Sequence, residues 1–353
     1  MFAWWGRTVA RLRWAVLAAA LVLVAVGATW GTGVFSVVTG SGFDDPASEA
    51  SRAAERITAE FGDRDADVIV LYSSDTATVD SPQFRDAVTE TLDRLRQRPE
   101  VTTVTSWYET QSPAMISGDR RATYAAVQLD GADDDAKMAV FERLRADFVA
   151  PGVQTEIGGY VPLLDASNEQ TVKDITRAEM LSLPVLLVLL ILIFRGLVAA
   201  AMPLVIGMLA ILGGFIAIRL LSLVTEISNF AINVITLIGL GMAIDYALFV
   251  VSRFREELNA GHDRRTAIVR PLATAGRTVF VSGLTITIAL ASLLIYPQAF
   301  LRSMALGGMS AVLIAMLGSL TALPALLVVL GPRINALRVP LPTWRRADPA
   351  APG

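Results

Sequence analysis

The chain has 353 residues, 54% of them hydrophobic and 18% charged, whereas soluble domains are nearer ~45–50% apolar and ~25% charged. It has no cysteine and one histidine, His262, which excludes disulfides, thiolate nucleophiles and the HExxH zinc motif. Neither lysine, Lys137 or Lys173, follows a glycine, which excludes a GxxxxGK[ST] phosphate loop. We therefore expect a membrane protein with no cofactor, no metal and no nucleic-acid partner.

Six apolar runs have about the 20 residues that cross the hydrocarbon core of a bilayer. The first, Trp14–Val38, follows three arginines. A cleaved signal peptide is the alternative, but the run is long and no A-x-A site closes it, which favours a transmembrane helix. The second run is short, and its helix is expected to begin earlier, outside the bilayer. The five later runs are Met180–Phe194, Leu197–Ile218, Ile227–Val251, Thr278–Tyr296 and Ser303–Leu330.

Arginine residues are distributed unequally between the two ends of these predicted helices. Fourteen lie in the N-terminus, the second-to-third loop, the fourth-to-fifth loop and the tail, whereas the opposite short loops hold Arg219 and Arg302. Because basic residues concentrate in cytoplasmic loops, both termini are predicted to be cytoplasmic. The long segment between the first and second helices is then extracytoplasmic, at the plasma membrane.

That long segment has the pattern of an α+β domain in which acidic residues outnumber basic ones, 27 to 14 over residues 43–179. After a first helix, the predicted order is strand–helix–strand–strand–helix–strand, which is the split βαβ, ferredoxin-like (βαββαβ) arrangement. The predicted elements are Pro46–Phe61, Ala66–Tyr72, Ser81–Arg98, Val101–Trp107, Ala122–Leu129, Asp133–Phe148 and Val153–Ile157. Trp107, Tyr108 and Tyr160 are expected in the domain core or at the membrane surface rather than along a route for apolar substrate.

The predicted fold class is therefore a polytopic α-helical membrane protein with six transmembrane helices and an α+β ferredoxin-like extracytoplasmic domain. Residues 1–13 form a cytoplasmic N-terminus and 14–38 the first transmembrane helix. Residues 39–179 form the extracytoplasmic domain and 180–330 transmembrane helices 2–6. Residues 331–353 form a cytoplasmic tail, which reads as a Pro- and Ala-rich linker from Pro340.

Asp245 is the acidic residue that lies well inside a predicted span. A charge at the bilayer centre costs ~2.5–3.5 kcal/mol on insertion scales, so such a residue needs a partner or a water-lined cavity. A low dielectric also brings protonation of a carboxylate within reach of neutral pH, which a proton carrier requires. The alternative is a structural aspartate that is hydrogen-bonded between helices.

Helical periodicity places Asp245 on one face with other residues of the fourth helix, and we expect this face to be buried. Gly241, one turn before Asp245, leaves room for a neighbouring helix. Tyr246 lies about 100° round the helix and can donate a hydrogen bond to an adjacent carboxylate, or is an ordinary membrane aromatic. The residues that share the face are Val234, Ile238, Gly241, Asp245 and Ser252.

The fifth helix carries small and hydroxyl residues at a spacing that places them on one face. Such residues allow close helix packing and hydrogen bonds between helices, which is their commonest role. The more specific alternative is that Ser282 or Thr285 lies beside Asp245 as a proton-relay partner. Both small faces are expected to pack within one half, and the Asp245 face is then expected to meet a second half. The fifth-helix face comprises Thr278, Ser282, Thr285, Ala289 and Ser292, and a comparable sixth-helix face comprises Gly307, Ala311, Ala315 and Gly318.

These segments resemble the N-terminal half of actinobacterial MMPL (mycobacterial membrane protein large) transporters of the resistance–nodulation–division superfamily. The resemblance is clearest from Gly158 to Gly331, and the matching segments together span nearly the whole chain. The Asp-Tyr pair and the FREEL segment after it are the most specific. The matching segments are GFDDP, DADVIVLYS, FRGLVAAAMPLVIG, GLGMAIDYALFVVSRFREEL, AGRTVFVSGLT and YPQAFLRSMALGG.

The resemblance implies a proton-driven exporter of lipids or other hydrophobic molecules, with a porter-type external domain. It places Asp245 and Tyr246 on the family's proton-relay pair, and Ser282 on the serine that follows the GRTV segment. Family members have two such halves and about twelve helices, whereas this chain has six predicted helices and one pair. A fragment, a half-size protein that dimerises and a degenerate half are the alternatives, and in the first two a second transporter half is the expected partner.

Two other classes of function are weighed against a transporter half. In the first, the chain is a non-transporting scaffold whose external domain binds envelope proteins, and Asp245 is structural. In the second, it is an envelope enzyme, which is disfavoured because the external domain lacks His and Cys and has no evident pair of carboxylates. A state of Asp245 that changes with pH and is coupled to substrate movement would distinguish the transporter from the scaffold.

Overall fold

The computed structural model describes residues 2–337 apart from 41, 43–44, 46 and 63–64. The chain divides into a helical unit, formed by Met1–Val38 with Arg177–Gly353, and an α+β unit, formed by Thr39–Thr176. The predicted helix start at Pro46 and the predicted linker from Pro340 lie outside the described residues.

Within the described residues, six helical segments are long and apolar enough to cross a membrane, which confirms the predicted number. As expected, the second begins well before its apolar run, at Tyr160. The helices are α1 (Phe2–Arg11), α2 (Arg13–Thr29), α7 (Tyr160–Phe194), α8 (Leu197–Leu221), α9 (Phe230–Asn259), α10 (Arg264–Ala291), α11 (Ala299–Leu320) and α12 (Ala322–Leu330). The short 3₁₀ turns η1 (Gly31–Ser36), η4 (Ser292–Ile295) and η5 (Gly331–Asn335) extend α2, α10 and α12.

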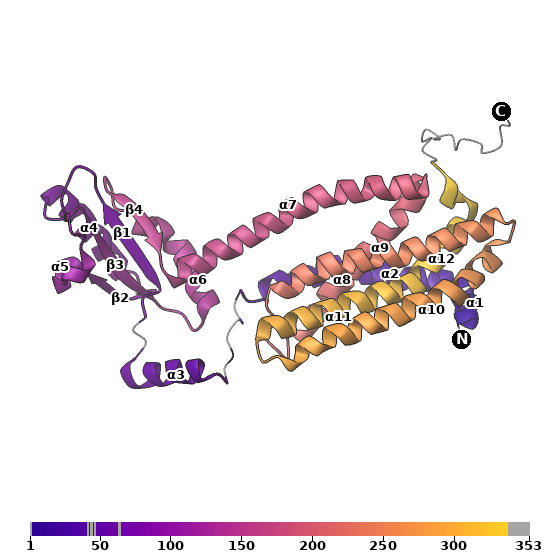
Figure 1. Ribbon diagram of the computed structural model, residues 1–353, viewed down its shortest axis with the longest axis horizontal. Helices are drawn as coiled ribbons and strands as arrows, with labels where there is room; N and C mark the ends of the chain where they lie inside the picture. Colours follow the sequence, from indigo (N-terminus) through magenta and orange to yellow (C-terminus); the bar gives the residue numbers. More distant parts are fainter. Residues whose placement is uncertain (1, 41, 43–44, 46, 63–64, 338–353) are drawn as a thin grey trace, which may run out of the picture. The chain divides into compact units, whose positions relative to one another are not determined.

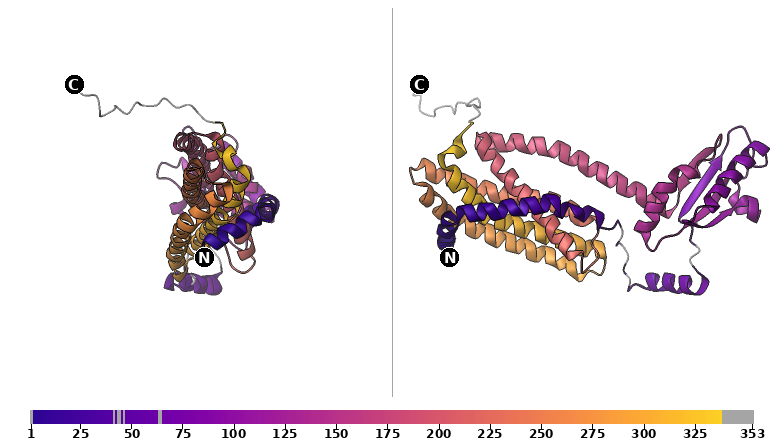
Figure 2. Two further views of the ribbon diagram at one scale, coloured as in Figure 1. Left: turned by 90° about the vertical axis from the view of Figure 1, so that its right-hand side faces the viewer. Right: turned by 180° about the vertical axis from the view of Figure 1, so that it is seen from behind.

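The helical unit is built around α9, which packs against α8 on one side and α11 on another (Figure 1). α10 packs on α9 and α11, and α2 lies along α8 and α12 (Figure 2). Close contact between α9 and α11 depends on Gly307, where an added Cβ would lie 2.7 Å from the carbonyl oxygen of Ala231. The small face predicted for the sixth helix is buried against α8 and α9, as expected: Gly307, Ala311, Ala315 and Gly318.

The sixth span is interrupted at Thr321, whereas the sequence predicted one continuous helix. Pro324 explains the interruption, because a proline has no N–H for the carbonyl four residues earlier and its ring clashes with that carbonyl. The carbonyl is that of Leu320, and it accepts a hydrogen bond from Nε1 of Trp5, at 3.0 Å. A distant indole therefore satisfies the polar group that the proline leaves free.

The α+β unit contains a four-stranded antiparallel sheet with the strand order β2-β3-β1-β4. Strand β1 is central, and its alternating Val68, Val70 and Tyr72 are fully buried. The strands are β1 (Val68–Ser73), β2 (Val101–Ser106), β3 (Ala122–Leu129) and β4 (Gln154–Gly158). The helices are α3 (Glu49–Phe61), α4 (Pro82–Arg96), α5 (Trp107–Thr110) and α6 (Asp134–Leu144), with 3₁₀ turns η2 (Pro113–Met115) and η3 (Arg145–Phe148).

Each predicted strand and longer helix of this unit is present, with ends that differ by a few residues. The turn between β2 and β3 was not predicted to contain a helix, and Trp107, placed at the end of a strand, instead begins α5. A buried ion pair supports the sheet from one end, because Asp67 accepts hydrogen bonds from Lys137 Nζ and from the Leu129 N–H, at 2.9 and 2.8 Å.

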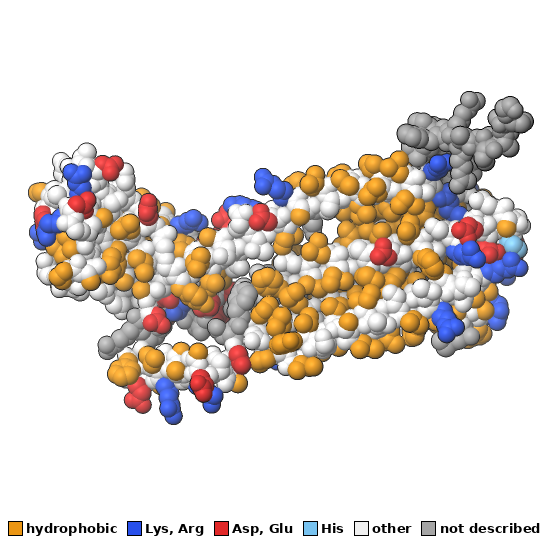
Figure 3. All heavy atoms as spheres, viewed as in Figure 1, with side chains coloured by type: hydrophobic (Ala, Val, Ile, Leu, Met, Phe, Trp, Pro, Cys, Tyr) orange, Lys and Arg blue, Asp and Glu red, His pale blue; other side chains and the backbone are white. Residues whose placement is uncertain are grey.

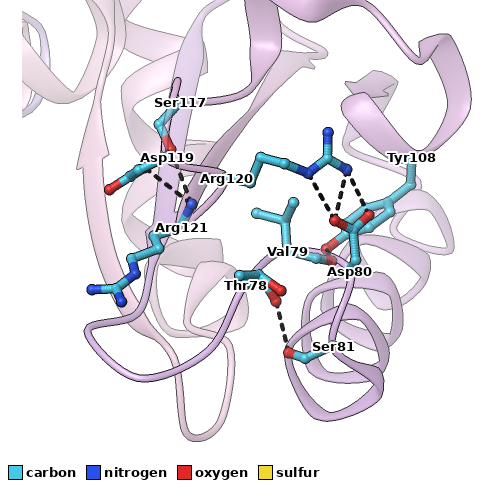
Figure 4. A network of polar contacts seen from close by, with 9 residues as sticks. All are labelled: Thr78, Val79, Asp80, Ser81, Tyr108, Ser117, Asp119, Arg120 and Arg121. Atoms are coloured by element: carbon cyan, nitrogen blue, oxygen red, sulfur yellow. Dashed lines mark hydrogen bonds and ion pairs between the residues drawn. The ribbon is translucent and has the colours of Figure 1, made fainter.

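The aromatic residues of the α+β unit belong to its fold. Trp107 is 8% exposed, and the guanidinium of Arg120 lies over its ring while binding both carboxylate oxygens of Asp80 (Figure 4). The Tyr108 hydroxyl donates a hydrogen bond to the Val79 carbonyl, at 2.8 Å, and burial raises the pKa of Tyr108 to about 12. These contacts agree with the expectation of a core role for Trp107 and Tyr108, whereas Tyr160 is 50% exposed and donates a hydrogen bond to Asp134.

Candidate functional site

Asp245 and Tyr246 are neighbours near the middle of α9 but point in different directions. Adjacent residues of an α-helix are about 100° apart, so one side chain can face the protein while the next faces outward. Tyr246 is 4% exposed and packs in the core of the helical unit, whereas Asp245 is exposed. The outer surface around the helices is mostly hydrophobic, with few charged side chains within it (Figure 3). Asp245 therefore presents a carboxylate on an apolar surface.

The part of the predicted α9 face around Asp245 is not covered by the described helices of this chain. Gly241 is exposed, and an added Cβ there would meet no atom within 4 Å. The buried side of α9 is a different one, which includes Ala243, Ala247 and Val250. The predicted face is open around Gly241 and Asp245, whereas Val234, Ile238 and Ser252 are partly buried. Gly241 consequently leaves room for a neighbour that this unit does not provide.

Ser282 of α10 lies beside Tyr246, and its role as a relay partner stays a prediction. The Tyr246 hydroxyl lies near the Ser282 side chain and within the field of the Asp245 carboxylate. It has no hydrogen bond of normal geometry, although its oxygen is buried. A buried, unsatisfied hydroxyl is uncommon and costs free energy unless a water molecule or another group completes it. Tyr246 can thus accept or donate a hydrogen bond when the groups around it change.

Thr285 does not join this cluster. Its side chain is exposed, and its hydroxyl donates to the Val281 carbonyl of the same helix, at 2.8 Å. The prediction that the small face of the fifth helix packs within this unit is wrong, since most of its residues are exposed and Ser282 is partly so. The name open face is used below for Gly241 and Asp245 on α9 together with five residues of α10 and η4: Thr278, Ser282, Thr285, Ala289 and Ser292.

Two further polar residues form contacts that the sequence did not reveal. Arg255 is half-buried and donates to the Phe194 carbonyl and to the Asn335 side chain, at 2.6 and 2.7 Å. It thereby connects the end of α7 to α9 and η5. His262 is partly buried, with Nδ1 3.2 Å from a carboxylate oxygen of Glu257. Arg255 lies in the FREEL segment, and the family resemblance of that segment was the sequence feature that could have identified it.

The carboxylate of Asp245 is a group that can bind and release a proton. The open face contains this carboxylate and the Ser282 hydroxyl, and the buried Tyr246 hydroxyl lies beneath it. Among the described residues there is no group of three or more His, Cys, Asp or Glu side chains that could hold a metal ion. The fold and the open face thus define a polytopic membrane protein with an ionisable group on one of its candidate spans.

The chain belongs to the MMPL family, whose model matches residues 42–349. It is 35% identical over 345 residues to the trehalose monomycolate exporter MmpL3 of Mycobacterium tuberculosis. It is 32% identical over 354 residues to the mycolic acid-containing lipids exporter MmpL11 of Mycolicibacterium smegmatis. It is also 40% identical over 314 residues to a putative membrane protein of Streptomyces coelicolor.

The alignments cover nearly all of this chain but a much smaller share of each relative. The alignment with the tuberculosis protein covers 96% of this chain but 36% of that relative, and the MmpL11 alignment covers 98% and 36%. The chain thus spans a little over a third of their length. A crystal structure of a heavy metal efflux pump matches with a TM-score of 0.53 and 14% identity, covering 81% of this chain and 40% of the pump chain. At that identity, the likeness concerns the fold alone.

Proposed function

We propose that this chain is one half of a proton-driven exporter of lipids or other hydrophobic molecules. The observation that carries the proposal is the exposed carboxylate of Asp245 on a membrane-spanning helix, next to the buried hydroxyl of Tyr246. Membership of the MMPL family supports it, as do two relatives that are named as lipid exporters.

The energy for export would come from proton movement through Asp245. Moving one elementary charge across the membrane potential yields ~2.3 kcal/mol per 100 mV, without any nucleotide site. The carrier must bind a proton on one side and release it on the other. Asp245 has the chemistry for this cycle, and in this proposal hydrogen bonds from Tyr246 and Ser282 stabilise one or other of its protonation states.

The open face supports a partnership with a second half. A carboxylate in contact with lipid is costly, by ~2.5–3.5 kcal/mol on insertion scales, and small residues on membrane helices favour close helix packing. Asp245 and Gly241 meet no helix of this unit that covers them. A second half, either another copy or a following segment, would supply polar groups to Asp245 and a helix against Gly241.

The placement of the other parts follows from the arginine distribution. Both termini lie in the cytoplasm, and the α+β unit is a ferredoxin-like, porter-type domain outside the plasma membrane. The strand order β2-β3-β1-β4, with α4 and α6 as the two connections, supports the split βαβ arrangement. In this proposal the α+β unit binds the hydrophobic substrate during export.

Reconstitution tests the proposal. Proteoliposomes that contain both halves are given a pH gradient, and movement of trehalose monomycolate is measured as the first test lipid. Asp245→Asn keeps size and polarity but cannot cycle a proton, so we expect transport to be abolished. Tyr246→Phe weakens transport, and Ser282→Ala weakens it less. The matched control, Asp130→Asn in the α+β unit, leaves transport unchanged. Full gradient-dependent transport by Asp245→Asn would favour the scaffold function, in which Asp245 is structural.

Cysteine cross-linking tests the second half directly, because the chain has no native cysteine. If a second copy covers the open face, Gly241→Cys forms disulfide-linked dimers on mild oxidation. Leu21→Cys, on the exposed side of α2, is the control and remains monomeric. If the two variants cross-link equally, the dimer does not use the open face.

A further inference from the structure

Helix α1 is held against α10 by a close backbone approach. An added Cβ at Gly6 would lie 3.2 Å from the Leu272 side chain and 3.4 Å from the Cα of Val269. Val9 and Ala10, on the same side of α1, are buried. This packing fixes the remaining side chains of α1 beside the first turns of α10.

A groove of about 740 Å³ opens between these two helices. Arginine is its main polar component, and its lining contains no acidic residue. A neighbouring hollow of about 490 Å³ shares Arg265 and adds Arg13 and Arg264, together with Asp263. The groove, called the α1–α10 groove below, is lined by Arg7, Ala10, Arg11, Arg265, Thr266, Val269 and Arg270.

Most of the arginines in the α1–α10 groove have no acidic partner in the structure. Arg270 is 3.2 Å from a carboxylate oxygen of Glu257. For Arg7, Arg11 and Arg265, the described part of the chain supplies no ion pair. Like charges that face the same space repel one another, so the groove favours an anion that would neutralise them. Arginine binds phosphate groups well, because its planar guanidinium can donate two parallel hydrogen bonds.

The tryptophans of α1 indicate where the groove lies in a bilayer. Trp4 is 60% exposed and Trp5 is 37% exposed, with its indole N–H bound to the Leu320 carbonyl. Tryptophan is enriched at the level of the lipid head groups, and an amphipathic helix with basic and aromatic side chains lies in that interface. The groove is therefore positioned for a lipid head group, with Ala10 and Val269 as apolar lining.

We infer that the α1–α10 groove is a binding site for the phosphate group of an anionic phospholipid in the surrounding leaflet. Basic pockets at the ends of membrane helices are suited to such head groups. The inference requires the helical unit to be in a membrane, but it does not depend on proton transport or on Asp245. The bound lipid would hold α1 against α10 by neutralising the arginines on both helices.

Native mass spectrometry of the purified full chain tests this site, with phosphatidylglycerol as the probe. We expect a saturable bound lipid in the wild type, and no comparable binding of zwitterionic phosphatidylcholine. Arg7→Gln with Arg265→Gln weakens binding by roughly 25-fold, about fivefold for each cation removed near the head group. The control pair, Arg253→Gln with Arg333→Gln, removes the same charge outside the groove and leaves binding within about twofold of the wild type.

Two further measurements distinguish loss of the site from misfolding of α1, and a lipid from a soluble phosphate ligand. Arg7→Lys with Arg265→Lys retains the charge, so it should retain most of the binding and show that α1 still folds in place. Inorganic phosphate is added as a competitor and should not displace the lipid at equal concentration. Equal weakening by the groove pair and the control pair would overturn the proposal. Displacement by inorganic phosphate would also overturn it, because the site would then belong to a soluble phosphorylated ligand.

Discussion

Substitution of Gly307 or Gly241 by alanine tests which faces of the helical unit are packed against another helix. At Gly307 an added Cβ would lie 2.7 Å from the Ala231 carbonyl oxygen, about 0.7 Å short of the 3.4 Å where ordinary contact begins. The atom in the way is backbone, so α9 and α11 must separate. Overpacking of this kind costs typically ~1–3 kcal/mol. At Gly241 an added Cβ meets nothing within 4 Å, so Gly241→Ala imposes no such separation.

Thermal unfolding of the purified chain in nanodiscs provides the assay, in a preparation that contains a single copy per disc. For a unit of this size, 1 kcal/mol shifts the Tm by ~2–4 °C, so we expect Gly307→Ala to lower it by roughly 2–12 °C. Gly241→Ala should leave the Tm unchanged or raise it slightly, because alanine favours the helix. An unchanged Tm for Gly307→Ala, or an equal loss for Gly241→Ala, would refute the packing described for α9.

Three further predictions concern contacts outside the open face. Arg219→Ala removes the guanidinium that lies over the Trp30 ring, 4.4 Å from its centroid. We expect a loss of stability of about 1–3 kcal/mol, measured as faster hydrogen exchange in η1. Exchange at the wild-type rate would contradict this role. Asp67→Ala removes the buried acceptor of Lys137 and costs about 3 kcal/mol in denaturant unfolding of the α+β unit, whereas a loss below about 1 kcal/mol would mean that the pair is dispensable. Tyr108 has a folded-state pKa raised from 10.0 to about 12, so its contribution to stability is complete below pH 10 and is lost as the pH rises to about 12. Tyr108→Phe should therefore show a shallower loss of stability over that range, and identical slopes would refute the assignment.

The spans and strands could be predicted because local patterns determine them. A run of about 20 apolar residues must form a helix in a bilayer, since its backbone groups have no other partner. Strand β3 alternates between buried and partly exposed side chains along its whole length, and this period identifies a strand. Pro324 shows the limit of such reasoning, because the apolar run Ser303–Leu330 predicted one helix and the structure shows a break between α11 and α12.

The site was predicted in part. Residue type, spacing and the family resemblance could single out Asp245, Tyr246 and Ser282, since a carboxylate within a span is rare, and their relay role stays a prediction. The direction of their faces could not, because periodicity distinguishes one side of a helix from another without identifying what covers each side. Gly241 illustrates this, as a small residue fits both a helix of the same unit and one from outside it. The contacts of Arg255 join segments far apart in the sequence, which no local pattern encodes.

Proton movement through Asp245 is the central claim, and its most direct test measures protons rather than lipid. Proteoliposomes that contain the assembled transporter and an internal pH dye are given an external acid step, with and without trehalose monomycolate. The wild type should acidify the interior faster when the lipid is present, and Asp245→Asn should acidify at the rate of empty liposomes in both conditions. Lipid-dependent acidification by Asp245→Asn at the wild-type rate would contradict the claim.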